Sequence, residues 1–310
     1  MLFARSQKKL FIVAGALLGV TLLVVLLRVF SGPSQEEVTG LPKFDTASVT
    51  AIKMTPKGGE GEILFEKKDG KWLIKPPGKN GKTLEASSAR ITELISLLSE
   101  LRVINLVART AADKGKFGLD TGYTSVTVMA GDDELATVMI GKAEMLGPQE
   151  MGSYVRSATS DDIYLVSGFL DMSFNADITV YRNRELGFGG AESWSEIRFT
   201  GKENFVITRS GTDWLLDGKK ADSAKVTGYL ATFASLEGNE FADEVTIGKD
   251  QKPVAKLEVR TVSGREFAIS AFVAGRDTVV ASTLAPGSLF KAGGVLALYG
   301  KLFPGRAGLK

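Results

Sequence analysis

One pattern occurs twice in this chain, and it limits the fold more than any other feature of the sequence. The first copy spans Ile63–Ile74 and the second spans Val206–Leu216. In each copy a run of strand-forming residues is followed by a polar turn that contains glycine, and then by a second run that opens near Trp72 or Trp214. This order is typical of a β-hairpin. The repetition predicts two copies of one structural unit.

Apolar residues at helical spacing follow each hairpin. In both copies they stand 3, 4, 7 and 10 positions after the first of them, which predicts one apolar face of a helix of about three to four turns. Ser87 or Ser88 is a candidate N-cap in the first copy, and Asp222 or Ser223 in the second, where Gly238 is a candidate stop. The apolar positions are Ile91, Leu94, Ile95, Leu98 and Leu101, and Val226, Tyr229, Leu230, Phe233 and Leu236.

Segments of alternating apolar and polar residues come next in both copies. Such alternation is typical of half-buried strands, and several of the segments are separated by glycine-containing turns. Each copy is therefore predicted to run in the order strand, hairpin, helix, hairpin and further strands. The predicted strands are 125–130, 135–140, 153–156 and 163–166 in the first copy, which ends in a helical stretch at 167–176, and 256–260, 266–271 and 278–282 in the second.

The N-terminal region differs from the rest of the chain. Leu10–Leu27 is a run of 18 residues without a charge, and Thr21 is its only polar side chain. As a helix it would extend about 27 Å, close to the thickness of a bilayer core. The residues that follow, Arg28–Ser31, make a poor cleavage site, so we predict an uncleaved signal anchor rather than a removed signal peptide.

Basic residues set the predicted orientation of this anchor. Arg5, Lys8 and Lys9 precede the run, and positive residues stay on the cytoplasmic side. Arg28 lies at the other end, where its long side chain reaches the interface. We expect a single-pass protein of the bacterial inner membrane with a cytoplasmic N-terminus and a periplasmic bulk. Gly15 and Gly19 lie four residues apart, a spacing that suits packing against another transmembrane helix.

These features together predict the fold class and the domains. We predict an α+β fold in which an N-terminal single transmembrane helix precedes two tandem repeats of mostly antiparallel sheet, each with a covering helix. Residues 1–33 are the predicted cytoplasmic stub and anchor, and 34–44 the linker. The first repeat is predicted at 45–186 and the second at 191–310, on either side of a cluster of glycines.

Composition excludes several kinds of chemistry. The chain has no histidine and no cysteine, so histidine-based triads, imidazole or thiolate metal sites and disulfides are all ruled out. Removing the four basic residues around the anchor leaves 34 basic against 36 acidic residues in the rest. A nearly neutral ectodomain gives no reason to expect nucleic acid as a partner.

Two short motifs resemble parts of known active sites. Gly78–Thr83 ends like a phosphate-binding loop, but Pro76 stands where the motif needs glycine, and we interpret the segment as a solvated loop. Ser288 and Lys291 have the serine-x-x-lysine spacing of penicillin-recognising enzymes. The companion motifs of those enzymes are absent, so we interpret this pair as a chance match.

Charged pairs and a lysine-rich stretch are further candidates. Asp132-Asp133 and Asp161-Asp162 are paired carboxylates, which we interpret as turn formers rather than glycosidase acids. We interpret the lysines between 67 and 82 as the exposed face and loop of a hairpin, with an anionic headgroup or acidic partner as the alternative. Trp72 and Trp214 are expected in the core, and Gly147–Gly152 is a candidate contact loop with an exposed methionine.

The order of these elements resembles the domain-of-unknown-function family 4340. The matching segments are Asp69–Trp72, Ala89–Ile91, Lys116–Leu119, Ile140–Lys142 and Tyr154–Arg156. The likeness covers roughly 45–185 well, and a second, divergent copy at roughly 192–300 keeps only the hairpin and the helix. The resemblance implies a membrane-anchored envelope protein associated with gliding-type ABC-2 transport systems, and the family has no catalytic motif to transfer.

We therefore expect a non-enzymatic periplasmic accessory or scaffold subunit of an ABC-2 type transporter complex. It is expected to have no catalytic, cofactor-binding or metal-binding residues and to bind no nucleotide. Its expected partners are the inner membrane and a transporter permease or periplasmic protein. One alternative is a periplasmic binding module for an envelope lipid or polymer, and a weaker one is a serine–lysine hydrolase.

Overall fold

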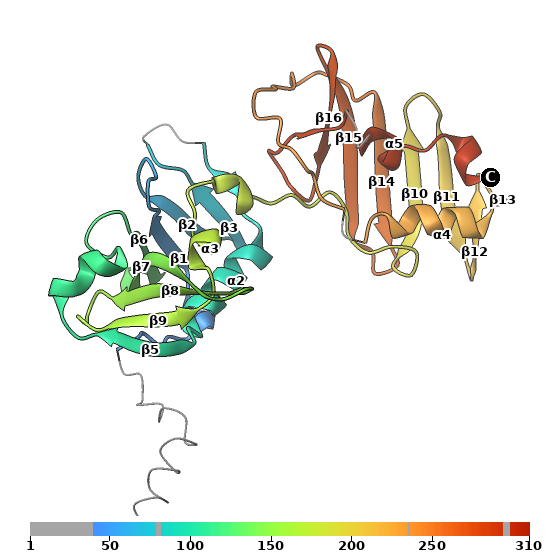
Figure 1. Cartoon of the computed structure of the whole chain (residues 1–310). Coiled ribbons are helices and arrows are strands. Elements are labelled where there is room, and N and C mark those ends of the chain that lie inside the picture. The colour runs from blue at the N-terminus through green and yellow to red at the C-terminus, as the bar shows by residue number, and fades with distance from the viewer. Residues whose placement is uncertain (1–39, 79–81, 235, 294–297) are drawn as a thin grey trace, which may run out of the picture. The chain divides into compact units, whose positions relative to one another are not determined.

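The structure is a computed structural model that describes residues 40–78, 82–234, 236–293 and 298–310 (Figure 1). The chain divides into two compact units, Met1–Leu41 and Pro42–Lys310. The predicted transmembrane helix at Leu10–Leu27 lies outside the described residues, together with Arg5, Lys8, Lys9, Arg28, Gly15 and Gly19. Among the helices that are described, none combines the length and the apolar character needed to cross a membrane.

Within the described residues, nine strands form a first antiparallel sheet in the order β4-β3-β2-β1-β6-β7-β8-β9-β5 (Figure 1). Neighbours along the chain are mostly neighbours in the sheet, except that β1 pairs with both β2 and β6, and β5 joins at the far edge beside β9. The strands are β1 (Ala51–Thr55), β2 (Ile63–Lys68), β3 (Lys71–Lys75), β4 (Leu84–Glu85), β5 (Val103–Ala108), β6 (Thr124–Ala130), β7 (Asp133–Gly147), β8 (Glu150–Ser157) and β9 (Ile163–Ser167).

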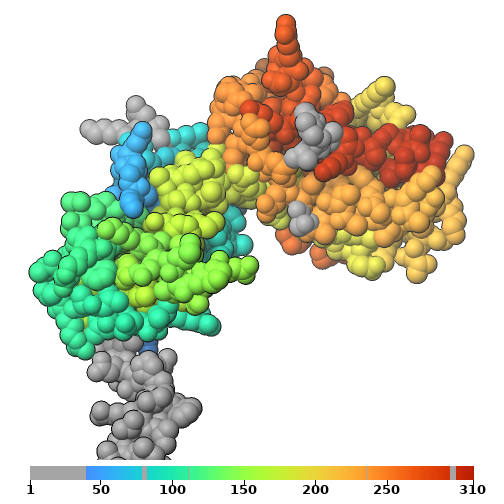
Figure 2. Space-filling model, in the orientation of Figure 1, coloured from blue at the N-terminus to red at the C-terminus, as the bar shows by residue number. Residues whose placement is uncertain are grey.

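A second antiparallel sheet has the order β13-β12-β11-β10-β14-β15-β16-β17. Across this sheet the strands follow the same order as in the first sheet, except that β5 has no counterpart. The tip of the β15–β16 hairpin projects from the surface around it, in orange in Figure 2. The strands are β10 (Trp194–Thr200), β11 (Phe205–Ser210), β12 (Asp213–Leu216), β13 (Lys219–Lys220), β14 (Ala255–Thr261), β15 (Glu266–Ala274), β16 (Asp277–Ser282) and β17 (Phe290–Lys291).

Helices are few and short among the described residues. The longest, α2 (Ser88–Ser99), has 12 residues, and α4 (Ser223–Ala231) has nine. The others are α3 (Leu170–Ser173), α5 (Leu298–Leu302) and the 3₁₀ helices η1 (Thr46–Ser48), η2 (Ala111–Phe117), η3 (Ile178–Val180) and η4 (Arg306–Leu309).

This architecture corrects the predicted fold class. We predicted α+β repeats behind a transmembrane helix, whereas the described chain is mostly antiparallel sheet in two sheets with few helices and no membrane-spanning helix. The prediction gave the helices too large a part in the fold, because each covering helix spans only part of a sheet of eight or nine strands. The helical stretch predicted at 167–176 shrinks to the four residues of α3.

The two predicted hairpins are present. β2 pairs with β3, and β11 with β12. In the first turn Asp69 and Gly70 both have positive φ, 51° and 79°, which is the backbone that a two-residue hairpin loop requires. Trp72 and Trp214 are both buried, as expected for core residues.

The helices after the hairpins begin where the capping residues predict. Ser87 accepts a hydrogen bond from the Arg90 backbone N–H, and Asp222 accepts from two backbone N–H groups of α4. The second helix is shorter than predicted, because it ends at Ala231 and Gly238 lies well beyond it. Phe233 lies in the turn after the helix, and its side chain is nevertheless buried.

Each sheet buries one face under its helix. In the first, the apolar side of α2 faces the sheet through Ile91, Leu94, Ile95 and Leu98, all of them buried. In the second, Val226 and Leu230 of α4 join a core that is rich in aromatic side chains. Burial of such side chains contributes about 1.5–3 kcal/mol each and is the main force that holds the sheets to their helices.

The other face of the first sheet is covered in part by the connection from β5 to β6. Phe117 of η2 packs on Tyr154 of β8, with ring centroids 4.7 Å apart. Gly141 of β7 lies against the backbone carbonyl of Phe117, so closely that a Cβ atom there would overlap it. The connection from α4 to β14 is similar in length to that from α2 to β6, but its described residues contain no named helix or strand, and the corresponding face of the second sheet carries a groove.

The segment between the sheets makes specific contacts. The Tyr181 hydroxyl donates to the Ser173 carbonyl oxygen at 2.8 Å, and burial raises the pKa of this tyrosine to about 12. The Arg182 guanidinium donates to both carboxylate oxygens of Asp243, at 2.6 and 2.9 Å. The Asn183 side chain donates to Glu85 and to the Leu284 carbonyl oxygen. These bonds fix the backbone as it leaves the first sheet.

Candidate functional site

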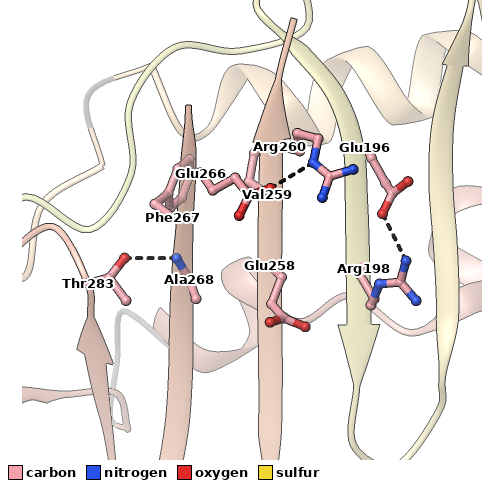
Figure 3. A pocket seen from close by; sticks show the side chains of 9 residues that line it. All are labelled: Glu196, Arg198, Glu258, Val259, Arg260, Glu266, Phe267, Ala268 and Thr283. Carbon is pink, nitrogen blue, oxygen red and sulfur yellow. Dashed lines mark hydrogen bonds and ion pairs between the residues drawn. The ribbon is translucent and has the colours of Figure 1, made fainter. Parts of the chain in front are cut away.

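A groove of about 380 Å³ lies on the outer face of the second sheet, the face turned away from α4 (Figure 3). It crosses strands β10, β14 and β15 and reaches Thr283 just after β16. Its polar lining residues are Glu196, Arg198, Glu258, Arg260, Glu266 and Thr283. Alternation along each strand places these side chains outside and sends their neighbours, such as Ile197, Val259 and Phe267, into the core.

Opposite charges face each other across neighbouring strands of the groove. Glu196 lies opposite Arg260, and Arg198 lies opposite Glu258 in the β10–β14 register. Arg260 in turn lies opposite Glu266 of β15. Cross-strand pairs of opposite charge stabilise a sheet by a few tenths of a kcal/mol to about 1 kcal/mol.

Hydrogen bonds join these charges into pairs (Figure 3). The Arg260 guanidinium donates to Glu266 at 2.7 Å, and the Arg198 guanidinium donates to Glu196 at 2.9 Å. The hydrogen bond that Arg260 donates to Glu266 raises the pKa of the arginine. The groove therefore presents charged side chains that are held in place by ion pairs.

Among the described residues that line the groove, Thr283 alone carries a hydroxyl group. It accepts a hydrogen bond from the Ala268 backbone N–H at 3.0 Å and so ties the end of β16 to β15. This bond gives Thr283 a structural role. No cluster of three or more metal-ligating side chains occurs among the residues that the structure describes.

The structure does not bring Ser288 and Lys291 to a common pocket. Ser288 is buried in the loop before β17, not on a helix, and Lys291 belongs to β17. The Lys291 ammonium donates to Glu240 at 2.5 Å, and this bond raises the pKa of the lysine. A lysine held in its charged form by a carboxylate is a poor proton acceptor for a serine.

The glycine-rich loop is only partly within the described residues. Residues 79–81 lie outside them, and Thr83 leads directly into β4. The following helix begins at Ser88, several residues later, so its N-terminus does not cradle a ligand held by this loop.

The lysine-rich stretch lies on and around the β2–β3 hairpin. Lys75 pairs with Glu66 at 2.6 Å, and this contact lowers the pKa of the glutamate. Lys71 pairs with Glu85 at 2.9 Å. Part of the basic charge is therefore neutralised within the sheet, which agrees with the interpretation of an exposed hairpin face.

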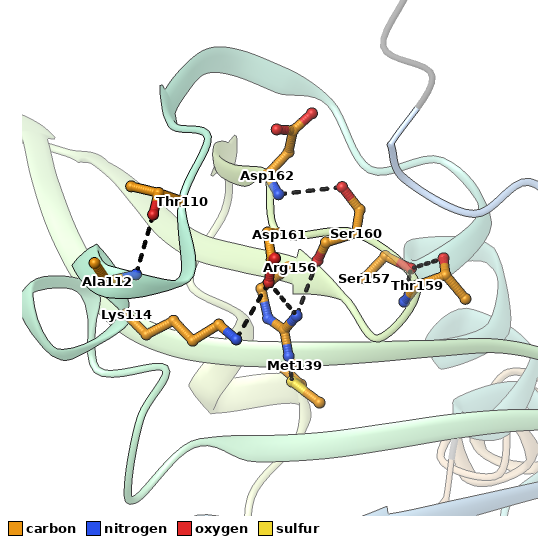
Figure 4. A network of polar contacts seen from close by, with 10 residues as sticks. All are labelled: Thr110, Ala112, Lys114, Met139, Arg156, Ser157, Thr159, Ser160, Asp161 and Asp162. Carbon is orange, nitrogen blue, oxygen red and sulfur yellow. Dashed lines mark hydrogen bonds and ion pairs between the residues drawn. The ribbon is translucent and has the colours of Figure 1, made fainter.

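The paired aspartates occupy two connections of the first sheet. Asp132 and Asp133 lie at the β6–β7 turn, where Asp133 opens β7. Asp161 and Asp162 lie between β8 and β9, within a network of polar contacts (Figure 4). Lys114 lies 3.3 Å and Arg156 3.6 Å from the same carboxylate oxygen of Asp161.

The predicted loop at Gly147–Gly152 is instead the turn and first residues of the β7–β8 hairpin. Met151 pairs with Met145 across it. The exposed methionine is Met145, which is 72% exposed, whereas Met151 is half-buried. Nearby α3 contributes the exposed Met172.

Sequence reasoning missed the groove residues on β10 and β14. The signal was present in the alternation of Glu196 and Arg198, and of Glu258 and Arg260, within predicted strands or beside them. A strand that alternates charged and apolar residues exposes all its charges on one face. Only the pairing of β10 with β14, which are distant in sequence, brings the two sets together.

Comparison with known proteins gives one positive result. The model of the family Domain of unknown function (DUF4340) matches residues 79–258, more than half of the chain. This match starts within the first sheet and ends within the second. Neither the curated proteins nor the solved structures contain a significant match.

Proposed function

We propose that this chain, which belongs to the Domain of unknown function (DUF4340) family, is a non-enzymatic accessory subunit that binds a partner protein through the outer face of its second sheet. The groove between Glu196, Arg198, Glu258 and Arg260 supports this function. Arg198 is paired with Glu196, Arg260 with Glu266, and Glu258 with Lys256 beside the groove. These ion pairs lie at the surface, so a partner of complementary charge pattern exchanges them for ion pairs of its own. Such complementarity selects a partner and speeds its association.

The N-terminal sequence supports a membrane location. The uncharged run Leu10–Leu27, with Arg5, Lys8 and Lys9 before it, favours attachment to the bacterial inner membrane with the bulk in the periplasm. We propose as the partner a permease or periplasmic component of a gliding-type ABC-2 transport system, which the family resemblance implies. The matching strand orders of the two sheets support a second proposal, that the chain holds two tandem copies of one unit.

A pull-down from native membranes in detergent tests this function. We expect the intact chain to recover a membrane partner, and the double variant Arg198→Ala/Arg260→Ala to lose most of it. The matched control is Lys71→Ala/Lys220→Ala, which removes two exposed, ion-paired cations outside the groove. Recovery of the protein alone, or equal losses in both double variants, would contradict the proposal.

The size of the groove favours a second candidate, the binding of an envelope lipid or polymer. A volume of about 380 Å³ accommodates a headgroup or a short sugar segment, and two arginines line it. The same variants decide between the candidates when purified protein is mixed with lipopolysaccharide or anionic lipid vesicles. Binding that depends on Arg198 and Arg260, without any protein partner in the pull-down, would favour this candidate.

A further inference from the structure

Arg156 is a buried cation without a forked carboxylate partner. It lies on β8 opposite Met139 and is 8% exposed. One terminal nitrogen donates to the Ser160 carbonyl oxygen at 2.9 Å, and the other lies 2.8 Å from the Met139 sulfur. The Nε atom is buried and has no hydrogen-bond partner among the described residues.

The nearest carboxylate is only loosely engaged. Asp161 Oδ1 lies 3.6 Å from the Arg156 guanidinium and 3.3 Å from the Lys114 ammonium, and the Asp161 side chain is 59% exposed. Figure 4 shows Lys114 reaching this oxygen from η2 and Arg156 reaching it from β8. Two cations thus meet at one exposed carboxylate oxygen.

Arg182 shows how this chain pairs a buried arginine with a carboxylate, although its Nε, like that of Arg156, has no hydrogen-bond partner among the described residues. It donates through both terminal nitrogens to the two oxygens of Asp243. A forked arginine–carboxylate pair of this kind is the strongest arrangement for the two groups. Arg156 has no such partner, although burying a charge without one is costly.

We propose that Arg156 and Lys114 form a binding site for a carboxylate of a ligand, such as an acidic peptide side chain, and that Asp161 occupies this site in the free protein. The resident group is itself a carboxylate, which indicates the chemistry that the site accepts. Asp161 lies in the exposed β8–β9 connection, so it can turn outward when a carboxylate replaces it. This site is on the first sheet and does not depend on the function proposed for the groove.

Isothermal titration of the full-length protein in detergent with a tetraglutamate peptide tests the site. We expect Asp161→Asn to bind the peptide about two- to fivefold more tightly than the wild type. The substitution removes the carboxylate that competes with the peptide, and an exposed ion pair of this kind contributes a free energy of that size. Adding Lys114→Met to Asp161→Asn is expected to abolish this gain. Lys114 is more exposed than Arg156, with side-chain exposures of 24% and 10%, so this variant carries less folding risk than replacing Arg156.

A matched control separates the site from the net charge of the protein. Asp213→Asn removes an exposed carboxylate that pairs with Lys220 at 2.9 Å, far along the chain from Arg156. An equal gain in Asp213→Asn, or no gain in Asp161→Asn, would overturn the proposal. Equal tightening toward inorganic phosphate would overturn the assignment to carboxylates.

Discussion

The two sheets have corresponding strand orders but differ in their cores and in their outer faces. The first adds the edge strand β5 and covers part of its outer face with η2, whereas the second leaves a charged groove open. The second core is also the more aromatic, and in it Trp194 contacts both Phe233 and Phe267. One order of strands therefore supports different surfaces, because the outward-facing side chains and the connections can vary while the inward-facing positions stay apolar.

The largest expected effect tests the aromatic core of the second sheet. Trp194 is fully buried and donates its indole N–H to the Phe188 carbonyl oxygen at 2.9 Å. We expect Trp194→Ala to lower the free energy of unfolding by about 3–5 kcal/mol, the usual cost of a large cavity. Urea unfolding followed by circular dichroism measures it. Val262→Ala, at a side chain 65% exposed, is the control, and similar losses in both variants would contradict the prediction.

The next effect tests the cover over the first sheet. Gly141→Ala places a Cβ against the Phe117 carbonyl oxygen and 2.9 Å from Leu119 Cγ. We expect a loss of about 1–3 kcal/mol from overpacking, with the strain relieved by displacement of η2. Hydrogen exchange is therefore expected to rise in residues 111–119. Unchanged exchange there would show that η2 does not depend on this contact.

A smaller effect distinguishes the two buried arginines. Arg182 lowers the pKa of Asp243 through their hydrogen bonds. We expect Asp243→Asn to cost about 0.5–1.5 kcal/mol at neutral pH, since the carboxylate is exposed on one side. Asp161→Asn is expected to cost less, because Asp161 makes only long contacts with Arg156 and Lys114.

The dependence on pH gives a sharper form of this test. A lowered pKa in the folded state means that the contribution of Asp243 is complete above its unfolded pKa of about 3.9 and is lost as the pH falls through the lower folded value. The difference in stability between wild type and Asp243→Asn is therefore expected to shrink below about pH 4. A difference that is constant from pH 7 to pH 3 would contradict the pairing with Arg182.

The smallest effect is stabilising. A Cβ on Gly228 of α4 would meet nothing within 4 Å, and the residue has helical backbone. We expect Gly228→Ala to raise the free energy of unfolding by about 0.5–1 kcal/mol through helix propensity. Thermal unfolding measures this change. Gly141→Ala is expected to destabilise the protein and Gly228→Ala to stabilise it, because the atoms around each glycine decide the effect of the added Cβ.

Local patterns predicted much of the fold. The hairpins around Trp72 and Trp214 and the caps at Ser87 and Asp222 were confirmed, because each depends on residues close together in sequence. The predicted fold class was wrong. The fraction of residues in strands depends on how many segments join each sheet, and local patterns do not give that number. Strand β5 was missed, because it is recruited by β9, more than fifty residues away.

The candidate sites were less predictable than the elements. The Asp161-Asp162 pair was identified as a turn former, and the structure places it in a connection, but its cations Lys114 and Arg156 come from other elements. The groove depends in the same way on the pairing of β10 with β14. Sites of this kind are set by tertiary contacts, which no local pattern in the sequence contains.

The outermost strands of the two sheets have a consequence for contacts between copies of this chain. In the part of the chain that the structure describes, three of the four outermost strands, β4, β13 and β17, have only two residues each. The fourth, β5, is interrupted by two register shifts against β9. Long, flat outer strands are what allow copies of a protein to zip together into aggregates. The edges of both sheets therefore offer another copy of the chain no long, regular strand with which to pair.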